Sequence, residues 1–399
     1  MKILLMDWPG FGCETIKKLF PQMGMETEIF DFPANDEGVR NGEELAMRIA
    51  QKVLDFQPDA LFSFNFYPVI ATAAHACRKK YISWVYDSPA SLLYSMTVFF
   101  PENHIFHFDS YEAERMLREG VEHAYYLPLA ANTEEYDRME PTALQRDKYR
   151  ADIAMIGSMY REDRFRIFKK YEDFDDYTKG YLEGLIRAQE ELYGVNILEG
   201  ALNDAIMERI MKTVPLTKEH GDSYETAAWT FANYYLAMQV TTREREHVLA
   251  ALSEKYETVL YTPGETAYLP KVKNRGGLDY YTEAPLAMKC ARINLNVTLR
   301  SIKNGIPLRV MDILGCGGFL MSNYQTDLAA EFVPGEDFVY YESIDDAVEK
   351  AGYYLKHEEE RAAIAESGYR KVKELHSFRT KIEEIINLVF EEGSGTAAE

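Results

Sequence analysis

Three cations and one carboxylate surround the expected start of a short helix in the second half of the chain. Arg300 and Lys303 precede this helix, and Arg309 and Asp312 lie three residues apart within it, so both project from one face. A helix N-terminus binds anions, because its free N–H groups and its dipole favour negative charge. The pattern predicts a diphosphate on the cations and a ribose on the Asp312 carboxylate. The alternative is an ordinary surface ion pair between Arg309 and Asp312.

A strand, a loop, a helix and a second strand must position these groups. An apolar run ends at Val297, and Asn304 and Gly305 form a turn. Pro307 stands at the expected helix start, where its fixed φ is suitable and its missing N–H costs nothing. Three glycines within 315–318 then end the helix before another apolar run. We therefore expect Asn304 and Gly305 to belong to the same binding loop.

The segment 294–324 resembles the donor-nucleotide motif of group 1 glycosyltransferases with the GT-B fold. The resemblance is greatest to the bacterial branch of spore-protein-maturation-like glycosyltransferases. In that family a Glu is followed by seven residues and a second Glu. Asp312 falls on the second acid, which typically holds the ribose, and Asn304 falls on the first. An amide therefore stands where the family has its first carboxylate.

Length and charge restrict the classes of function. The chain has 399 residues, which is long for one core, so we expect two domains. Its net charge is −21, which argues against a nucleic-acid partner and against docking on anionic lipid. The four cysteines form no CxxC pair, and no apolar run approaches membrane-spanning length. We expect a reduced, cytoplasmic protein without a membrane span, and the sequence leaves the oligomeric state open.

In the first half of the chain, strands alternate with helices, which predicts a parallel sheet. Ligands of such sheets bind at the carboxyl ends of the strands. Gly10 and Gly12 follow the first expected strand, Asn65 and Tyr67 follow the third, and Asp87 follows the fourth. We expect these residues on the acceptor side of the site.

Asp87 is the candidate general base. Asp109 lies just before a helix expected at Tyr111, so a capping role explains it. Asp87 is followed by Pro89 and has no such explanation. A carboxylate at a strand end is suited to removing the proton from an acceptor hydroxyl.

The resemblance also implies roles for two other places in the second half. A strand over 152–156 ends in Gly157 and Ser158, whose backbone amides are expected to face the donor. Tyr280 or Tyr281 is expected to stack on a uracil-like base, although either could instead belong to the core. Gly157, Ser158 and Tyr280 therefore complete the expected donor site.

The resemblance implies an α/β protein of two Rossmann-like domains that face each other across a cleft, with a helical insert in the second. The polar stretch 132–150 is the expected linker. The expected parts are an acceptor-side domain at 1–148, a donor domain at 149–376, an insert at about 165–235, a terminal helix at 377–392 that packs on the first domain, and a disordered tail at 393–399.

The implied activity is that of a hexosyltransferase-type enzyme that moves a sugar from a nucleotide diphosphate, expected to be UDP, to an acceptor hydroxyl. Arg309 would stabilise the leaving diphosphate and Asp87 would act as base, without a metal or another cofactor. The acceptor is a glycan, a protein or a small molecule. The alternatives are a non-catalytic protein that binds nucleotide sugars and a nucleotide-sugar epimerase of the same fold.

Overall fold

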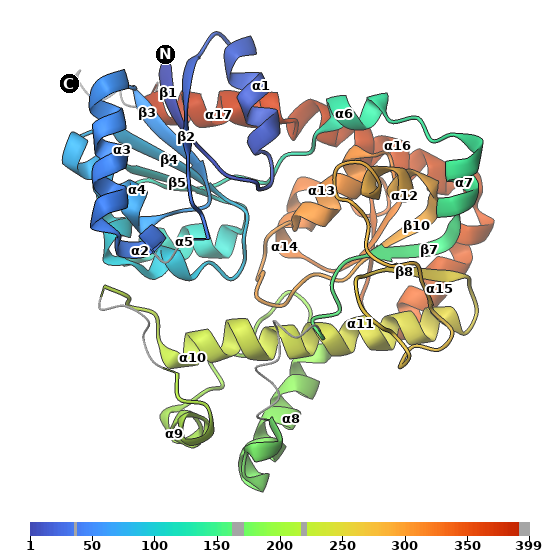
Figure 1. The fold of residues 1–399 in the computed structure, drawn as a ribbon. Helices are drawn as coiled ribbons and strands as arrows, with labels where there is room; N and C mark the ends of the chain where they lie inside the picture. The colour runs from blue at the N-terminus through green and yellow to red at the C-terminus, as the bar shows by residue number, and fades with distance from the viewer. Residues whose placement is uncertain (36–37, 162–170, 217–221, 391–399) are drawn as a thin grey trace, which may run out of the picture. The chain divides into compact units, whose positions relative to one another are not determined.

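The computed structural model describes residues 1–35, 38–161, 171–216 and 222–390, which form two compact units (Figure 1). Unit 1 combines Met1–Leu129 with Lys218–Glu225 and Phe378–Glu399. Unit 2 combines Ala130–Thr217 with Thr226–Ser377. The expected tail at 393–399 and parts of the expected insert lie outside the described residues. The domain boundaries given above stay predictions.

Unit 1 is built on a six-stranded parallel sheet in the order β2-β1-β3-β4-β5-β6. Its strands are β1 (Lys2–Asp7), β2 (Glu26–Asp31), β3 (Ala60–Phe64), β4 (Lys80–Val85), β5 (Asn103–His107) and β6 (Ala124–Tyr126). Its α-helices are α1 (Cys13–Gln22), α2 (Gly38–Asn41), α3 (Glu43–Phe56), α4 (Pro68–Cys77), α5 (Ser110–Glu119) and α17 (Phe378–Phe390). Every residue of β3 and β5 is buried, as expected for central strands covered on both faces.

Alternating side chains divide the core of unit 1 between the two faces of its sheet. Leu61 of β3 packs in a cluster with residues of α3 and α4. Phe62 points to the opposite face, where its ring contacts Phe20 of α1 at 5.3 Å between centroids. On that face Trp84 contacts Phe378 of α17 at 5.9 Å. The C-terminal helix is therefore part of the core of unit 1.

Unit 2 is built on a second parallel sheet in the order β12-β11-β10-β7-β8-β9. Its strands are β7 (Ala151–Ile156), β8 (Thr258–Tyr261), β9 (Lys273–Asn274), β10 (Ala291–Asn296), β11 (Leu320–Asn323) and β12 (Val339–Tyr341). Around the sheet lie α11 (Ala237–Ser253), α12 (Ala284–Cys290), α13 (Leu308–Gly315), α14 (Thr326–Glu331), α15 (Ile344–Lys356) and α16 (Glu358–Leu375). The strand order reverses between β7 and β10, which is the switch point of a doubly wound sheet.

The expected linker at 132–150 is more ordered than its polar composition indicated. It contains two short helices, α6 (Thr133–Arg138) and α7 (Ala143–Tyr149). A capping box begins the second one, because Thr142 and Gln145 each bond the backbone of the other. The two helices were not predicted from the sequence, although Thr142-x-x-Gln145 is the pattern of a capping box. The place of this stretch as a linker stays a prediction.

The helical character of the insert is confirmed in its described part. It contains α8 (Asp176–Glu190), α9 (Asp204–Thr213), α10 (Ala227–Thr230) and a π-helical segment, Phe231–Leu236, that leads into α11. These helices share a core of their own, in which Leu182, Ile210 and Leu236 are fully buried. The same core contains Phe174, Phe231 and Tyr235, so these aromatic residues of the insert serve packing.

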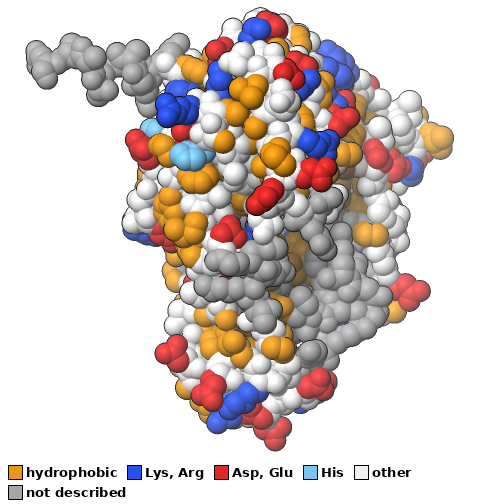
Figure 2. All heavy atoms as spheres, turned by 60° about the vertical axis from the view of Figure 1, so that its left-hand side comes forward, with side chains coloured by type: hydrophobic (Ala, Val, Ile, Leu, Met, Phe, Trp, Pro, Cys, Tyr) orange, Lys and Arg blue, Asp and Glu red, His pale blue; other side chains and the backbone are white. Residues whose placement is uncertain are grey.

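Two observations bear on the expected partners. On the face drawn in Figure 2, Lys and Arg side chains are interspersed with Asp and Glu and do not gather into a basic patch. Among the helices that the structure describes, none is both long and apolar enough to cross a membrane.

Candidate functional site

The switch point of unit 2 brings together the loops that follow β7 and β10. Arg245 of α11 holds both loops close to the ends of their strands. Its Nε and Nη2 donate to the Val297 carbonyl oxygen at 3.2 and 2.7 Å, and its Nη1 donates to the Ser158 carbonyl oxygen. Ser158 Oγ accepts a hydrogen bond from the Tyr160 amide at 2.8 Å. Gly157 and Ser158 therefore lie where open α/β sheets bind their ligands.

Helix α13 follows the β10 loop. Hydrogen bonds close its C-terminus, whereas its N-terminus has no side-chain cap in the described structure. It ends in a Schellman motif, in which the Gly318 amide donates to the Ile313 oxygen and the Gly317 amide to the Leu314 oxygen, both at 2.9 Å. Gly317 has a φ of 72°, which glycine adopts without a steric cost. At the start, Pro307 is the N-cap residue, and no side chain caps the helix. Its first amides are therefore directed toward any anion placed there.

Asp312 lies one turn into α13 and is 2% exposed. Its Oδ1 accepts hydrogen bonds from the hydroxyls of Tyr136 at 2.8 Å and Tyr280 at 2.9 Å, and its Oδ2 lies 3.1 Å from the Tyr280 hydroxyl. Burial raises the pKa of Asp312, and the charge of Arg309 and the two hydroxyls oppose this rise. Two tyrosines thus occupy the carboxylate that was expected to hold a ribose.

Arg309 is the cation of this region whose hydrogen-bonding capacity is not fully used. Its Nη1 lies 3.9 Å from Asp312 Oδ2, which is too long for a hydrogen bond. In the part of the chain that the structure describes, this buried nitrogen has no hydrogen-bond acceptor. A buried donor without an acceptor is costly, so an anionic ligand would stabilise it. Arg309 is therefore the best-supported residue of the expected diphosphate site.

Arg300 and Lys303 each lie near a carboxylate, and only the Arg300 pair is close enough for hydrogen bonds. Arg300 is 6% exposed, and its Nε lies 3.0 and 2.9 Å from the two carboxylate oxygens of Glu244. Its Nη1 also donates to the Leu192 oxygen at 2.9 Å. Lys303 Nζ lies 3.9 Å from Glu199 of the insert. The charge of Arg300 is neutralised internally, so we do not retain Arg300 as a diphosphate ligand.

The turn residues and Tyr280 also have roles within the fold. The Asn304 carbonyl oxygen accepts the Asp327 amide at 3.0 Å, and the Gly305 oxygen accepts Gln325 Nε2 at 3.2 Å. Both bonds fix the loop before α13 through its backbone. The Tyr280 hydroxyl is held by Asp312, as described above, whereas Tyr281 is 48% exposed. The two rings meet edge to face at 4.9 Å. Stacking of Tyr280 on a base stays a prediction.

The two arginines differ in their expected contribution to stability. Breaking a buried ion pair by removing one partner costs about 3–5 kcal/mol, because the other charge stays buried. We therefore expect Arg300→Met to lower the free energy of unfolding by about that amount, through Glu244. Arg309→Met should lower it by less, since Arg309 lies 3.9 Å from its carboxylate and its buried Nη1 has no acceptor within the described part of the chain. Urea unfolding of both variants measures the difference, and equal losses would contradict the distinction.

The tyrosine contacts of Asp312 are testable in the same way. Tyr136→Phe leaves Asp312 with one hydroxyl donor, and loss of a partner from a buried charged group costs about 1–3 kcal/mol. The matched control is Tyr177→Phe, because Tyr177 is 62% exposed and its substitution should change stability little. Urea unfolding gives both values. A change in Tyr136→Phe no larger than in the control would show that the hydroxyl bond has no net effect.

In unit 1, Asn65 and Asp87 meet at the carboxyl ends of β3 and β4. Asn65 Nδ2 donates to Asp87 Oδ2 at 2.7 Å, while Asn65 Oδ1 accepts the amides of Tyr86 and Asp87 at 3.0 and 3.2 Å. Asn65 has a φ of 60°, a conformation that Asn tolerates better than most residues. Surrounding protein raises the pKa of the Asp87 carboxyl, although the residue is exposed, and the Asn65 bond opposes this rise. Asn65 therefore orients Asp87.

The other residues expected on the acceptor side shape the turn after β1 and the core below it. A side chain at Gly10 would come within 2.5 Å of the Trp8 ring. Gly12 has a φ of 75°, and a side chain there would come within 2.5 Å of the Phe64 ring. Tyr67 is 5% exposed. Its backbone amide donates a hydrogen bond to the Tyr81 hydroxyl at 3.0 Å. These three residues contribute to shape, and direct contact with an acceptor stays a prediction.

Three residues of these sites were not predicted from the sequence: Tyr136, Glu244 and Arg245. Tyr136 lies in the polar stretch that was interpreted as a linker. Glu244 and Arg245 lie in a charged run of α11, which is typical of a solvated helix. Yet Glu244 is 8% and Arg245 9% exposed. Thr241, Thr242 and Val248 are also buried on α11. Their weak apolar pattern was the one sequence signal for a buried face, and it was not recognised.

Solved structures with a similar architecture identify the fold of the chain. A sucrose-phosphate synthase from Thermosynechococcus elongatus has a TM-score of 0.57 with this chain at 10% identity, over 99% of this chain and 100% of that chain. HepE from Anabaena, in complex with UDP and glucose, has a TM-score of 0.52 at 10% identity, over 99% and 98% of the two chains. The chain has the GT-B fold. This confirms the predicted fold class of two Rossmann-like domains with a helical insert.

Two further comparisons concern this GT-B chain. AviGT4, a glycosyltransferase involved in avilamycin A biosynthesis, has a TM-score of 0.51 at 14% identity, over 99% of each chain. Residues 243–387 match the family described as glycosyl transferase-like, and this region contains Arg309 and Asp312. No curated protein sequence matches the chain. The resemblance to the spore-protein-maturation-like branch stays a prediction.

Proposed function

We propose that the protein is a glycosyltransferase that moves a sugar from a nucleotide diphosphate to an acceptor hydroxyl. The observation that carries this proposal is the buried Nη1 of Arg309 at the start of α13, which has no acceptor among the residues that the structure describes. A family match over 243–387 includes both residues. The UDP and glucose bound by HepE, which shares the fold, support a UDP-sugar as donor.

The donor half of the proposed reaction belongs to unit 2. As the bond between the sugar C1 and the diphosphate oxygen breaks, negative charge grows on the diphosphate. The guanidinium of Arg309 and the first amides of α13 would stabilise this charge, with Lys303 as a further cation. These groups would replace a divalent metal, so we propose metal-independent transfer. A ribose hydroxyl would take the place of the Tyr280 hydroxyl on Asp312, which frees the Tyr280 ring to stack on the base.

The acceptor half belongs to unit 1. Asp87 would remove the proton from the acceptor hydroxyl as that oxygen bonds to C1, and Asn65 would hold the carboxylate in position. With Asp87 as base, the reaction inverts the configuration at C1. We further propose transfer of a hexose and a cytoplasmic location. The location rests on the four cysteines, which are free in the structure, as expected in a reducing compartment.

A second candidate is a protein that binds a nucleotide sugar without turning it over. Two observations favour it: Tyr136 and Tyr280 already bond to Asp312, and Asn304 stands where the resembled family has an acid. The candidates differ in slow hydrolysis of the donor. A transferase releases nucleotide diphosphate from its donor without an acceptor, whereas a pure binder does not.

Thermal unfolding in the presence of UDP-, GDP-, dTDP- and ADP-sugars tests the donor site. A ligand at 100 times its dissociation constant stabilises the native state by about 2.7 kcal/mol. We expect one nucleotide class to raise Tm, and Arg309→Ala to lose that increase. The control is Arg370→Ala, because Arg370 is a largely exposed residue paired with Glu366 on α16. If no nucleotide sugar raises Tm, the donor site is not where we place it.

A further inference from the structure

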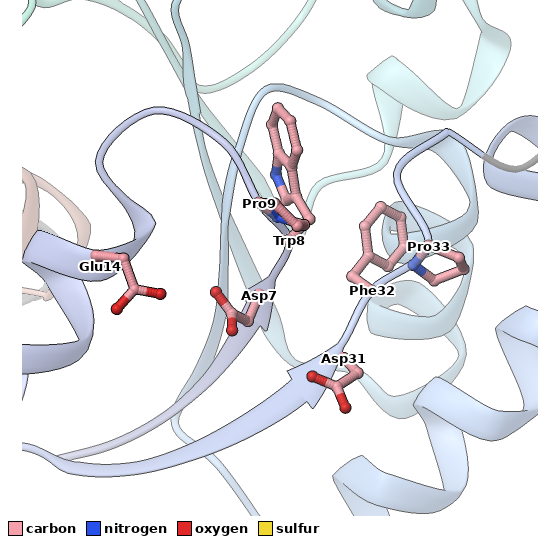
Figure 3. Close-up of a pocket in the computed structure, with 7 residues that line it drawn as sticks. All are labelled: Asp7, Trp8, Pro9, Glu14, Asp31, Phe32 and Pro33. Carbon is pink, nitrogen blue, oxygen red and sulfur yellow. The ribbon is translucent and has the colours of Figure 1, made fainter. Parts of the chain in front are cut away.

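A hollow of about 410 Å³ opens in unit 1 at the carboxyl ends of β1 and β2. Three carboxylates line it, those of Asp7, Glu14 and Asp31 (Figure 3). Its other lining residues are apolar: Trp8, Phe32 and the prolines that follow them. Figure 3 shows Asp7 and Asp31 at the ends of neighbouring strands, with the rings of Trp8 and Phe32 above them. Among the residues that the structure describes, no Lys or Arg lines the hollow.

The three carboxylates are not equivalent. Lys17 Nζ donates to Asp7 Oδ2 at 2.9 Å and also to Glu14. The hydrogen bonds to Glu14 and Asp7 raise the pKa of Lys17 to about 12. Asp31 has no ion pair or hydrogen bond from another side chain in the described structure, and it is exposed. One cation thus faces three acids, and the uncompensated charge is centred on Asp31.

The apolar wall of the hollow is fixed by contacts that lead to Asp87. The Trp8 ring is stacked on Tyr86, which precedes Asp87, at 6.4 Å between centroids. The Phe32 ring meets Tyr67 at 4.6 Å. Trp8 also leaves a polar group unsatisfied, because its buried Nε1 has no acceptor in the described structure. Both rings of the wall are therefore held by neighbouring tyrosines, one of which precedes the proposed base in the sequence, and the wall retains one spare donor.

These features together define the chemistry of a ligand. Aromatic and proline faces pack against the C–H groups of a sugar ring, while carboxylates bond its hydroxyls. An acidic or phosphorylated sugar would meet three carboxylates of like charge. A divalent cation needs several oxygens, and Asp7 and Glu14 are already committed to Lys17. A ligand with an ammonium group would supply the positive charge that Asp31 lacks.

We propose that this hollow binds an acceptor that carries an ammonium group on a sugar ring, with the ammonium at Asp31 and the ring against Trp8 and Phe32. The assignment names the class of acceptor and so deepens the proposed function. It rests on that function only in treating the bound molecule as the acceptor of the sugar. Binding in the hollow itself does not depend on the donor.

The test is binding of methyl glucosaminide to the full chain, measured by calorimetry at a pH where the amine is charged. Methyl glucoside and methyl N-acetylglucosaminide are the neutral controls, and spermidine is the control for an amine without a ring. We expect methyl glucosaminide to bind about tenfold more tightly than either neutral sugar, which is the effect of one hydrogen bond to a charged group. Asp31→Asn should abolish that preference, and spermidine should bind less well than methyl glucosaminide.

A second measurement shows where the probe binds. The indole N–H signal of Trp8, assigned from Trp8→Phe, should shift when methyl glucosaminide is added. Equal binding of charged and neutral sugars, a preference unchanged by Asp31→Asn, stronger binding of spermidine, or an unmoved Trp8 signal would each overturn the assignment. Nucleotide sugars should raise Tm equally in wild type and Asp31→Asn. A failure here is therefore distinct from a failure of the donor site.

Discussion

Replacing Arg309 by alanine should lower the rate of sugar transfer by about 100- to 1,000-fold, the effect of removing one group that stabilises a developing anion. The reason is geometric. Arg309 lies in the first turn of α13, and its Nη1 is buried without an acceptor in the described chain. A diphosphate oxygen would satisfy that donor most strongly when the leaving group carries its full charge. The loss should therefore appear in kcat as well as in kcat/KM.

Two variants control this experiment. Arg309→Lys keeps the charge but loses the planar guanidinium, so its activity should lie between those of the wild type and Arg309→Ala. Arg370→Ala removes an exposed arginine and should be close to wild type. Urea unfolding separates loss of activity from loss of fold. If folded Arg309→Ala transfers sugar at the wild-type rate, Arg309 does not bind the leaving group.

Replacing Asp87 by asparagine should lower the rate of transfer by about 100- to 10,000-fold, the range for loss of a general base. Asparagine preserves the size of the side chain but cannot accept the proton. Donor binding, measured as the increase in Tm with the nucleotide sugar, should stay unchanged because it depends on unit 2. Asn65→Ala should give a smaller loss, since Asn65 acts by holding Asp87 in place.

The pH dependence provides a separate test of Asp87. A base acts when deprotonated, so kcat/KM should fall as the pH drops through the pKa of the carboxyl. Desolvation by the surrounding protein raises that pKa above its ordinary value, and the Asn65 bond partly opposes the rise. Asn65→Ala removes the opposing bond and should move the acidic limb to higher pH. A profile that is the same in wild type and Asp87→Asn would contradict the assignment of the base.

Much of the fold could be predicted from the sequence because its signals are local. Helix α3 (Glu43–Phe56), for example, buries Leu45, Ile49 and Val53, which recur at helical spacing, and such spacing can be recognised in the sequence. The pair of Arg309 and Asp312 was accessible for the same reason, because a separation of three residues fixes their relation on a helix. Asn65 and Asp87 were each assigned to a strand end, and neighbouring parallel strands bring such ends together.

The pairing of the charged groups was not predictable in this way. Arg300 meets a carboxylate 56 residues away, and the Tyr136 hydroxyl reaches Asp312 across 176 residues. Such contacts depend on how the insert and the segment before β7 pack against the second sheet. The sequence pattern assigns a cation to the β10 loop, but it does not show that Glu244 neutralises it. Three cations were therefore expected at the diphosphate, whereas in the described residues Arg309 is the one of the three that has a buried nitrogen without an acceptor.

Release of nucleotide diphosphate by the wild-type chain tests the central claim most directly. The chain would be incubated with UDP-, GDP-, dTDP- and ADP-sugars, with and without EDTA, and free nucleotide diphosphate measured over time. We expect release from one nucleotide class, at the same rate with EDTA and greatly slowed in Arg309→Ala. Binding without any release would contradict the proposed transferase and favour a binding protein. Release abolished by EDTA would contradict the proposal that Arg309 and the α13 amides replace a metal.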